Sequence, residues 1–207
     1  MKIKALVLSL VLVLTVFTGC AKTAAPTPAP TTPAPAATAP AKTDTVTTAS
    51  IVNENAAFEK ALTADGGHYV IAILKDMTFD KDLAVNGDFK TGKKDANGAL
   101  IKDAEGKEQT QRKIALYTQD DKHKVTSRFT LTAPKITFNS NYGSLEHGTF
   151  KGDVYVSGKN FKLVNAKIDG NLYFLNEDAQ KTFKIADVAS DLDGVKTVVT
   201  GKTELKK

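Results

Sequence analysis

The sequence is poor in the residue types that usually build reactive sites. It has one cysteine, no tryptophan and three histidines among 207 residues. A single cysteine excludes an intramolecular disulfide. His68, His123 and His147 are scattered along the chain, and the sequence contains neither a Ser/His/Asp motif nor a glycine-rich phosphate loop. We therefore expect no cofactor and assign no catalytic residue.

Proline is missing from most of the chain and concentrated in one place. Six of the seven prolines lie in residues 26–40, interleaved with alanine and threonine. Such a segment has almost no large apolar side chain and cannot bury a core. We expect residues 20–50 to be a disordered linker, which in the polyproline II conformation would reach roughly 90 Å at about 3.1 Å per residue. A tether of this kind holds a folded domain away from a membrane.

A long apolar run occurs at the N-terminus, where residues 5–17 follow Lys2 and Lys4. Its length fits the apolar core of a signal peptide and is short for a membrane span. The run ends in FTGC at Cys20, which resembles a bacterial lipobox. The resemblance implies a lipoprotein signal peptide over residues 1–19, acylation of Cys20 and a lipid-anchored domain on the extracytoplasmic face of the bacterial cell membrane. An ordinary secretory signal and an uncleaved anchor are the alternatives.

Charge of one sign is not in large excess. The chain has 28 Lys and Arg against 23 Asp and Glu; removing residues 1–19 takes away Lys2 and Lys4 and no acid, which leaves 26 against 23, or +3. Nucleic-acid-binding proteins instead cluster their basic residues. We therefore expect no nucleic-acid partner, and the remaining residues 51–207 have the length of a single domain.

The start of this domain predicts a helix followed by a strand. Residues 53–64, NENAAFEKALTA, place four apolar side chains on one stripe, with Asn53 or Asn55 as the N-cap. The apolar residues 68–74 follow a glycine pair and predict the strand. We expect the helix to cap a stack of strands that would otherwise end in an exposed edge. The stripe consists of Ala57, Phe58, Ala61 and Leu62.

Two short phrases recur in the second half of the chain. FKGDVYV (150–156) lies over IDGNLYF (168–174) at an offset of 18 residues from Phe150 to Ile168, and residues 78–85 are a weaker copy. FTLTAPKI (129–136) aligns with FKLVNAKI (161–168). FKIA at 183–186 begins a further copy after a helical turn expected at residues 176–183, which stretches that period to 22 residues.

The repetition predicts an all-β fold, a short-coil right-handed parallel β-helix with an N-terminal capping helix. Strands of three to five residues cannot bury one face alone, but they can share a core when stacked at about 4.8 Å. Glycine at each corner is expected to let the backbone turn. An antiparallel β-sandwich is the competing architecture. Val154 and Val156 should stack inside on Leu172 and Phe174, with Tyr155 stacked outside on Tyr173 and Asp153 over Asn171.

Residues 90–113 interrupt the pattern and predict an exposed polar insertion. Charged residues dominate, with turn signals at Asn97-Gly98 and Glu105-Gly106. The acidic residues there do not have the spacing of a calcium loop, and Asp191-Leu192-Asp193-Gly194 is half of one without a closing carboxylate. We therefore predict solvated turns and no metal site. The acidic set consists of Asp95, Asn97, Asp103, Glu105 and Glu108.

Coils of the form Gly-Asx-aliphatic-x-apolar, with a period near 18 over about residues 129–199, resemble those of bactofilins, which are polymer-forming right-handed β-helices. The resemblance implies a β-helix that could self-assemble. The chain differs from bactofilins in its export signal, its helical cap and its long insertion. As a whole it resembles a small bacterial lipoprotein with a β-helix domain.

The outward tyrosines are the sharpest candidates for binding. Tyr155 and Tyr173 should form an exposed aromatic pair that can bind flat sugar faces or another protein. Lys151, Lys162 and Lys167 are expected near this surface, where they could attract anionic wall polymers. The alternative is that tyrosine is simply favoured in strands. Among the histidines only His147 lies beside the best repeat, and it is expected to be a solvated turn residue.

The sequence therefore favours a non-enzymatic, membrane-tethered scaffold or adhesion module, which binds cell-wall glycan or an envelope protein through the Tyr155/Tyr173 face. A polysaccharide-active β-helix enzyme is one alternative. Asp153 and Asp169 lie at expected coil corners, where short acids form turns whether or not they act in catalysis. A self-assembling surface polymer of the bactofilin type is the other alternative.

Overall fold

The computed structural model describes residues 49–103, 105–188 and 194–206. They are mostly β-strand, with two helices in the described part, which confirms the all-β class. The expected signal peptide, Cys20 and the linker up to residue 48 lie outside the described residues, as do Asp191 and Asp193. The first strand, β1, begins at Ala49, two residues before the domain start expected from the sequence.

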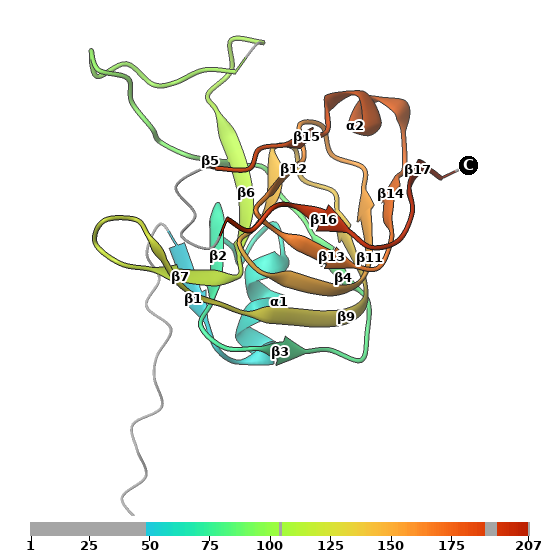
Figure 1. Cartoon of the computed structure of the whole chain (residues 1–207). Helices are drawn as coiled ribbons and strands as arrows, with labels where there is room; N and C mark the ends of the chain where they lie inside the picture. The colour runs from blue at the N-terminus through green and yellow to red at the C-terminus, as the bar shows by residue number, and fades with distance from the viewer. Residues whose placement is uncertain (1–48, 104, 189–193, 207) are drawn as a thin grey trace, which may run out of the picture. The chain divides into compact units, whose positions relative to one another are not determined.

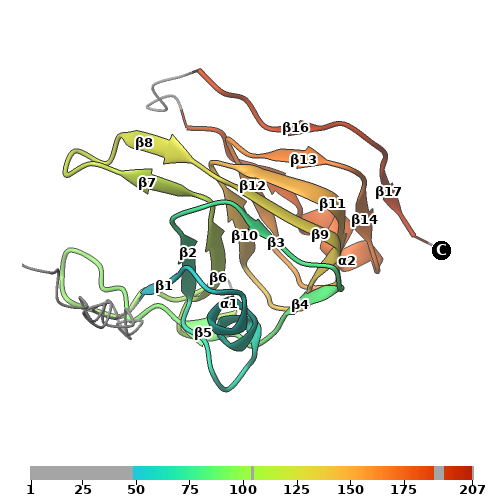
Figure 2. The ribbon, with the colours of Figure 1, turned by 90° about the horizontal axis from the view of Figure 1, so that it is seen from below.

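Most strands belong to two sheets whose pairings are parallel, which excludes the antiparallel sandwich (Figures 1 and 2). Sheet A has the order β1-β2-β6-β10-β12-β15, and β5 adds an antiparallel pair at β6. In sheet B, β9 and β11 are the long central strands, flanked by β3 and β4 on one side and by β13, β14, β16 and β17 on the other. Successive strands of this kind fit a β-helix-like fold.

The bounds of the sheet A strands and of β5 are Ala49–Val52 (β1), Val70–Ile73 (β2), Phe89–Lys90 (β5), Thr110–Ala115 (β6), Gly143–Glu146 (β10), Lys162–Val164 (β12) and Lys184–Ile185 (β15). Those of sheet B are Met77–Thr78 (β3), Leu83–Val85 (β4), Thr130–Phe138 (β9), Thr149–Val156 (β11), Lys167–Asp169 (β13), Leu172–Phe174 (β14), Val198–Val199 (β16) and Thr203–Leu205 (β17).

The register of the clearest repeat is confirmed. Val154 pairs with Leu172, Tyr155 with Tyr173 and Val156 with Phe174. The apolar members of these pairs are buried. The side chain of Asn171 donates to Asp153 Oδ1 at 2.8 Å, so the polar corner is also stacked as predicted.

The second repeated phrase was aligned wrongly in part. Leu131 pairs with Phe150 in sheet B, whereas Leu163 lies in sheet A and pairs with Leu145 and Ile185. Residues 129–136 therefore do not stack on residues 161–168. Both segments alternate apolar and polar residues, and this pattern alone cannot tell which sheet a strand joins. The pairing of Leu163 with Ile185 does confirm the copy at residues 183–186.

Glycine is required mainly because neighbouring backbones approach closely. A Cβ on Gly170 would lie 2.0 Å from the carbonyl oxygen of Gly152, and a Cβ on Gly152 would lie 1.9 Å from that of Ala133. Gly152 also has φ of +133°. The expectation of a turning glycine at each corner is wrong elsewhere, because the left-handed residues around β10 and β12 are Tyr142, His147, Asn160 and Asn165.

Helix α1 (Asn55–Leu62) lies at the N-terminal end of the stack, beside β1, β2 and β4 (Figure 2). Its buried face contains Phe58, Ala61 and Leu62, with Ala57 packed beside them, so the predicted apolar stripe is confirmed. The predicted N-cap is wrong: Glu54 occupies it without a side-chain bond, while Asn55 donates to the carbonyl of Thr78.

Two excursions leave the sheets on the side of sheet A. The insertion projects beyond β5 and β6 (Figure 1) and contains two turns in which Asp95 and Asp103 accept backbone N–H groups. It ends before Thr110, earlier than predicted, because residues 110–113 belong to β6. The second excursion is a hairpin that the sequence did not reveal, formed by β7 (Tyr117–Gln119) and β8 (Val125–Arg128).

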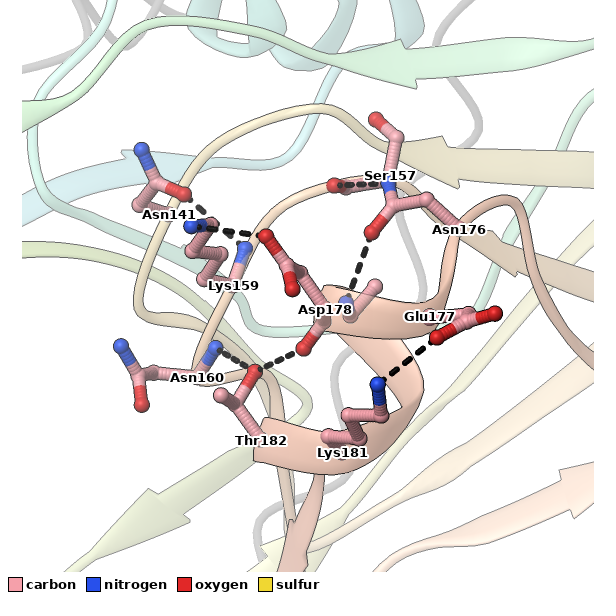
Figure 3. Close-up of polar contacts among 10 residues, drawn as sticks. Asn141, Ser157, Lys159, Asn160, Asn176, Glu177, Asp178, Lys181 and Thr182 are labelled. Carbon is pink, nitrogen blue, oxygen red and sulfur yellow. Dashed lines mark hydrogen bonds and ion pairs between the residues drawn. The ribbon is translucent and has the colours of Figure 1, made fainter.

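Helix α2 (Glu177–Thr182) confirms the helical turn expected before the last repeat. Polar contacts fix it to the adjacent corners (Figure 3). Asp178 pairs with Lys159 at 2.9 Å, and Thr182 Oγ1 accepts from the backbone N–H of Asn160. The hydrogen bond and charge of Lys159 lower the pKa of Asp178. These groups hold the helix in place, so we assign the cluster a structural role.

Candidate functional site

The predicted tyrosine pair exists, and a lysine covers it. The ring centroids of Tyr155 and Tyr173 lie 5.0 Å apart at an interplanar angle of 45°. Lys206 Nζ lies 4.7 and 4.6 Å from the two centroids and donates to the Tyr155 hydroxyl at 2.7 Å. Lys135 Nζ lies 5.5 Å from the Tyr155 ring. A sugar that stacked on these rings would have to displace the Lys206 ammonium.

The three predicted lysines do not gather around these tyrosines. Lys151 lies on β11 before Gly152, whereas Tyr155 lies after it, and Lys167 pairs with Thr149 at the same end of β11 as Lys151. Both lysines are therefore separated from the tyrosines along the sheet. Lys162 lies on β12, in sheet A. The lysines beside the tyrosines are Lys135 and Lys206, and neither belongs to the phrase that repeats at residues 150–156 and 168–174.

A more site-like feature lies over the outer face of sheet A. A groove of about 370 Å³ opens there above β10 and β12, and we call it the sheet A groove. Its volume is at the low end of the range of about 300–1,000 Å³ that is typical of ligand sites. Its lining residues are Lys93, Gln109, Thr110, Gln111, Tyr142, Ser144, Glu146, His147, Lys162, Val164, Ala186 and Val188.

The floor of this groove consists of polar side chains that are almost completely buried. Leu145 of β10 points into the core, so Ser144 and Glu146 point outward, yet they are only 3% and 8% exposed. His147, which follows them, is 7% exposed, so the expectation of a solvated turn residue is wrong. Burying polar groups costs free energy unless they are paired, which makes this floor unusual for the outer face of a sheet.

Glu146 is held by two partners. Its Oε2 lies 2.6 Å from Lys113 Nζ on β6, and its Oε1 accepts from Ser144 Oγ at 2.9 Å. Burial works to lower the pKa of Lys113, but the charge and hydrogen bond of Glu146 raise it above its ordinary value. Lys113 and Glu146 therefore form a charge-compensated pair at the edge of the groove.

The walls are positioned by contacts around two corner residues. Arg128 of the β7–β8 hairpin donates to the carbonyl of His147 at 2.6 Å, and the Tyr117 ring packs on His147 with centroids 4.4 Å apart. Asn165 Oδ1 accepts from the backbone N–H of Val188 at 2.8 Å and so fixes the opposite wall. These bonds make the groove a built feature of the fold.

Asp187 anchors the same wall from the other end. Its carboxylate accepts from the backbone N–H of Asn165 at 3.0 Å and from both the backbone N–H and the hydroxyl of Thr197. Burial works to raise the pKa of Asp187, but the bonds from Thr197 and Asn165 hold it below its ordinary value. Asp187 therefore remains ionised and keeps Ala186 and Val188 beside the groove.

The groove contains little that points to hydrolysis. Among the lining residues that the structure describes, Glu146 is the only carboxylate, whereas most glycoside hydrolases use two. Across residues 49–103, 105–188 and 194–206, no group of three or more His, Cys, Asp or Glu side chains could hold a metal ion. The other two histidines lie apart: the carbonyl of His68 accepts from Arg112, and His123 is exposed on the β7–β8 hairpin.

The sequence carried one overlooked signal for this site. GSLEHG (143–148) has an apolar residue alternating with Ser144 and Glu146, followed by His147, directly before the clearest repeat. Burial of the outward polar residues depends on the insertion and on residues 186–188, which are distant in the chain.

Comparison with protein-family models gives no match to this chain, and comparisons with curated proteins and with solved structures give none either. Within the described ranges, neither helix is long and apolar enough to span a membrane.

Proposed function

We propose that this chain is a bacterial surface lipoprotein in which a right-handed β-helix serves as a non-enzymatic binding module, tethered to the extracytoplasmic face of the membrane. The single observation that carries the binding role is the sheet A groove, with its buried Ser144, Glu146 and His147. The candidate partners are cell-wall glycan or an envelope protein.

The β-helix assignment is supported by the order of the parallel pairings. Thr149 pairs with Thr130 before it and with Lys167 after it, and the residues of sheet A advance in the same direction. Parallel strands joined by crossovers are almost always right-handed, which supports the proposed hand. An experimental structure showing left-handed crossovers would refute this part of the proposal.

The anchor is supported by the sequence FTGC and by the proline-rich segment that follows it. Expression of the full chain in a bacterium fed radioactive palmitate should label the protein. The label should disappear in Cys20→Ala and persist in Ser9→Ala, a matched change in the apolar run. Label that remains on Cys20→Ala would refute the anchor.

The binding role is tested with the full chain in detergent and isolated cell envelope. We expect retention by the envelope to decrease when Ser144→Leu fills the floor of the groove. A matched exposed change, Ser127→Leu on β8, should leave retention unchanged. Equal retention of both variants and the wild type would remove the groove from the proposal.

The tyrosine face remains a second candidate surface because it combines stacked rings with Lys135 and Lys206. The double variant Tyr155→Ala/Tyr173→Ala should reduce envelope retention if this face binds. Unchanged retention would leave these tyrosines with a purely structural role.

Self-assembly is a second candidate function, favoured by the last strands of both sheets. Ile185 on β15 is 57% exposed and Val198 on β16 is 48% exposed, at the end of the stack opposite to α1. Unprotected edge strands can pair with another chain. Electron microscopy of the full chain should show filaments if this edge assembles, and Ile185→Lys should abolish them.

A further inference from the structure

We propose that the sheet A groove binds an acidic glycan, that is, a sugar chain bearing carboxylate or phosphate groups. The inference rests on the proposed binding function and specifies its ligand class.

The charges that line the groove favour an anion. Glu146, the single carboxylate among the described lining residues, is already compensated by Lys113 at 2.6 Å. Lys93 and Lys162 also line the groove, and neither ammonium group takes part in an ion pair with another described residue. The groove therefore presents two lysine charges without an ion-pair partner, while the carboxylates of Asp103 and Glu105 line the adjoining pocket beyond Tyr142. A neutral ligand would leave both lysine charges unused.

The remaining lining groups suit a hydroxyl-rich molecule. Gln109, Thr110, Gln111 and Tyr142 supply amide and hydroxyl groups that can donate and accept hydrogen bonds. Burial, together with the charges of Asp103 and Glu105, raises the pKa of Tyr142, so its phenol stays protonated and can donate to an oxyanion.

The opposite wall is apolar and matches the C–H face of a sugar ring. Ala186 and Val188 form it, and Val164 of β12 adds an apolar side chain to the floor beside Glu146. The groove is open to solvent, so a short stretch of a longer chain can lie in it while the rest continues outside. A compact organic anion would pair with the lysines, but it would make no hydrogen bond to the amide groups of Gln109 and Gln111.

Calorimetry of the full chain in detergent tests the ligand class with three probes. Tetragalacturonate carries carboxylates, a phosphorylated maltotetraose carries phosphate groups, and maltotetraose is neutral. We expect one or both acidic probes to bind at least tenfold more tightly than maltotetraose, with affinity that falls as salt is raised. The stronger acidic probe identifies the source of the negative charge. Equal or tighter binding of maltotetraose overturns the proposal.

Matched double variants show whether binding occurs in the groove. Lys93→Gln/Lys162→Gln should weaken the acidic probe roughly twentyfold, since an exposed ion pair contributes up to about 1 kcal/mol, or roughly fivefold. Lys151→Gln/Lys167→Gln removes the same net charge from sheet B and should change affinity less than about twofold. Equal losses of affinity in the two double variants would mean that the acidic probe is attracted by the charge of the whole surface and not by the groove. This result would overturn the proposal.

Glu146→Gln shows whether the affinity for the acidic probe depends on the charge in the groove or only on the stability of the fold. Removing this carboxylate should strengthen binding of the acidic probe and leave the melting temperature within a few degrees of wild type. Weaker binding by a variant that remains folded would contradict the proposal. If the wild type is retained by envelope but neither acidic probe competes, the ligand class is wrong and the binding function stands. If the envelope does not retain the wild type at all, the binding function itself is refuted.

Discussion

Arg112 offers a sharp test of how helix α1 is held. Its side chain is completely buried, and its guanidinium donates to the carbonyls of Ala61 and Thr63 at 2.6 and 3.0 Å and to that of His68. The guanidinium carbon also lies 4.2 Å from the centre of the Phe89 ring. The first two carbonyls belong to the C-terminal end of α1, which leaves its last carbonyls unpaired within the helix. We predict that Arg112→Met will loosen this helix.

The magnitude follows from two opposing contributions. Hydrogen bonds to a charged group contribute about 1.5–3 kcal/mol each, and unpaired buried carbonyls cost a similar amount, so three bonds provide roughly 4–9 kcal/mol. Burial opposes them: it lowers the pKa of Arg112 from its ordinary value to about 10, which corresponds to about 3 kcal/mol. Methionine keeps much of the apolar stem. We therefore expect Arg112→Met to reduce the free energy of unfolding by about 2–5 kcal/mol.

Urea unfolding of the full chain in detergent, followed by circular dichroism, measures this difference. Hydrogen exchange should in addition show faster exchange for amides in α1 than for amides in β11. Lys122→Met, at the exposed end of the β7–β8 hairpin, is the control and should change the free energy by less than about 0.5 kcal/mol. A loss in Arg112→Met no larger than in this control would refute the reasoning, because it would mean that desolvation of the guanidinium cancels its bonds.

Two further predictions concern the stack and the floor of the groove. Gly170→Ala should lower the free energy of unfolding by about 2–4 kcal/mol in the same assay, because the new Cβ would lie 2.0 Å from the backbone oxygen of Gly152. The pKa of Lys113 is raised in the folded state, so the stabilisation from its pair with Glu146 is complete below about pH 10.5 and is lost as pH rises through the folded value. Between pH 9 and 12, the free energy of unfolding should therefore fall by about 1 kcal/mol more in the wild type than in Glu146→Gln, and parallel curves would contradict this.

The sequence predicted the fold well where its periods were undisturbed. The 18-residue offset between Val154 and Leu172 was sufficient to give the correct register, because a one-residue slip would bring Tyr155 into the core. The turn before Phe183 was also predictable, since a local helix lengthens the chain between Leu163 and Ile185 without changing their pairing.

Prediction failed where two strand segments had the same alternation but belonged to different sheets. Leu131 and Leu163 both follow a phenylalanine by two residues, yet Leu131 pairs within sheet B and Leu163 within sheet A. Arg112 was assigned to the polar insertion for a similar reason. Its neighbours are polar or charged, and the carbonyls that allow its burial lie at the end of α1 and at His68, which are distant from it in the chain.

The groove could not be predicted from repetition, because it forms where repetition is interrupted. The insertion before β6, the hairpin after β6 and residues 186–188 after β15 each lie on the side of sheet A. They surround β10, whose own neighbour β12 follows at the undisturbed offset of 18 residues, from Ser144 to Lys162. An ordinary outward position thereby becomes the floor of a groove, and Glu146 is buried with a partner on the adjacent strand. Repeated positions such as Tyr155 and Tyr173 satisfy the packing of the stack, whereas positions enclosed by non-repeating segments are free to serve a ligand. The strand flanked by the most interruptions is therefore the place in such a chain where binding residues should be sought.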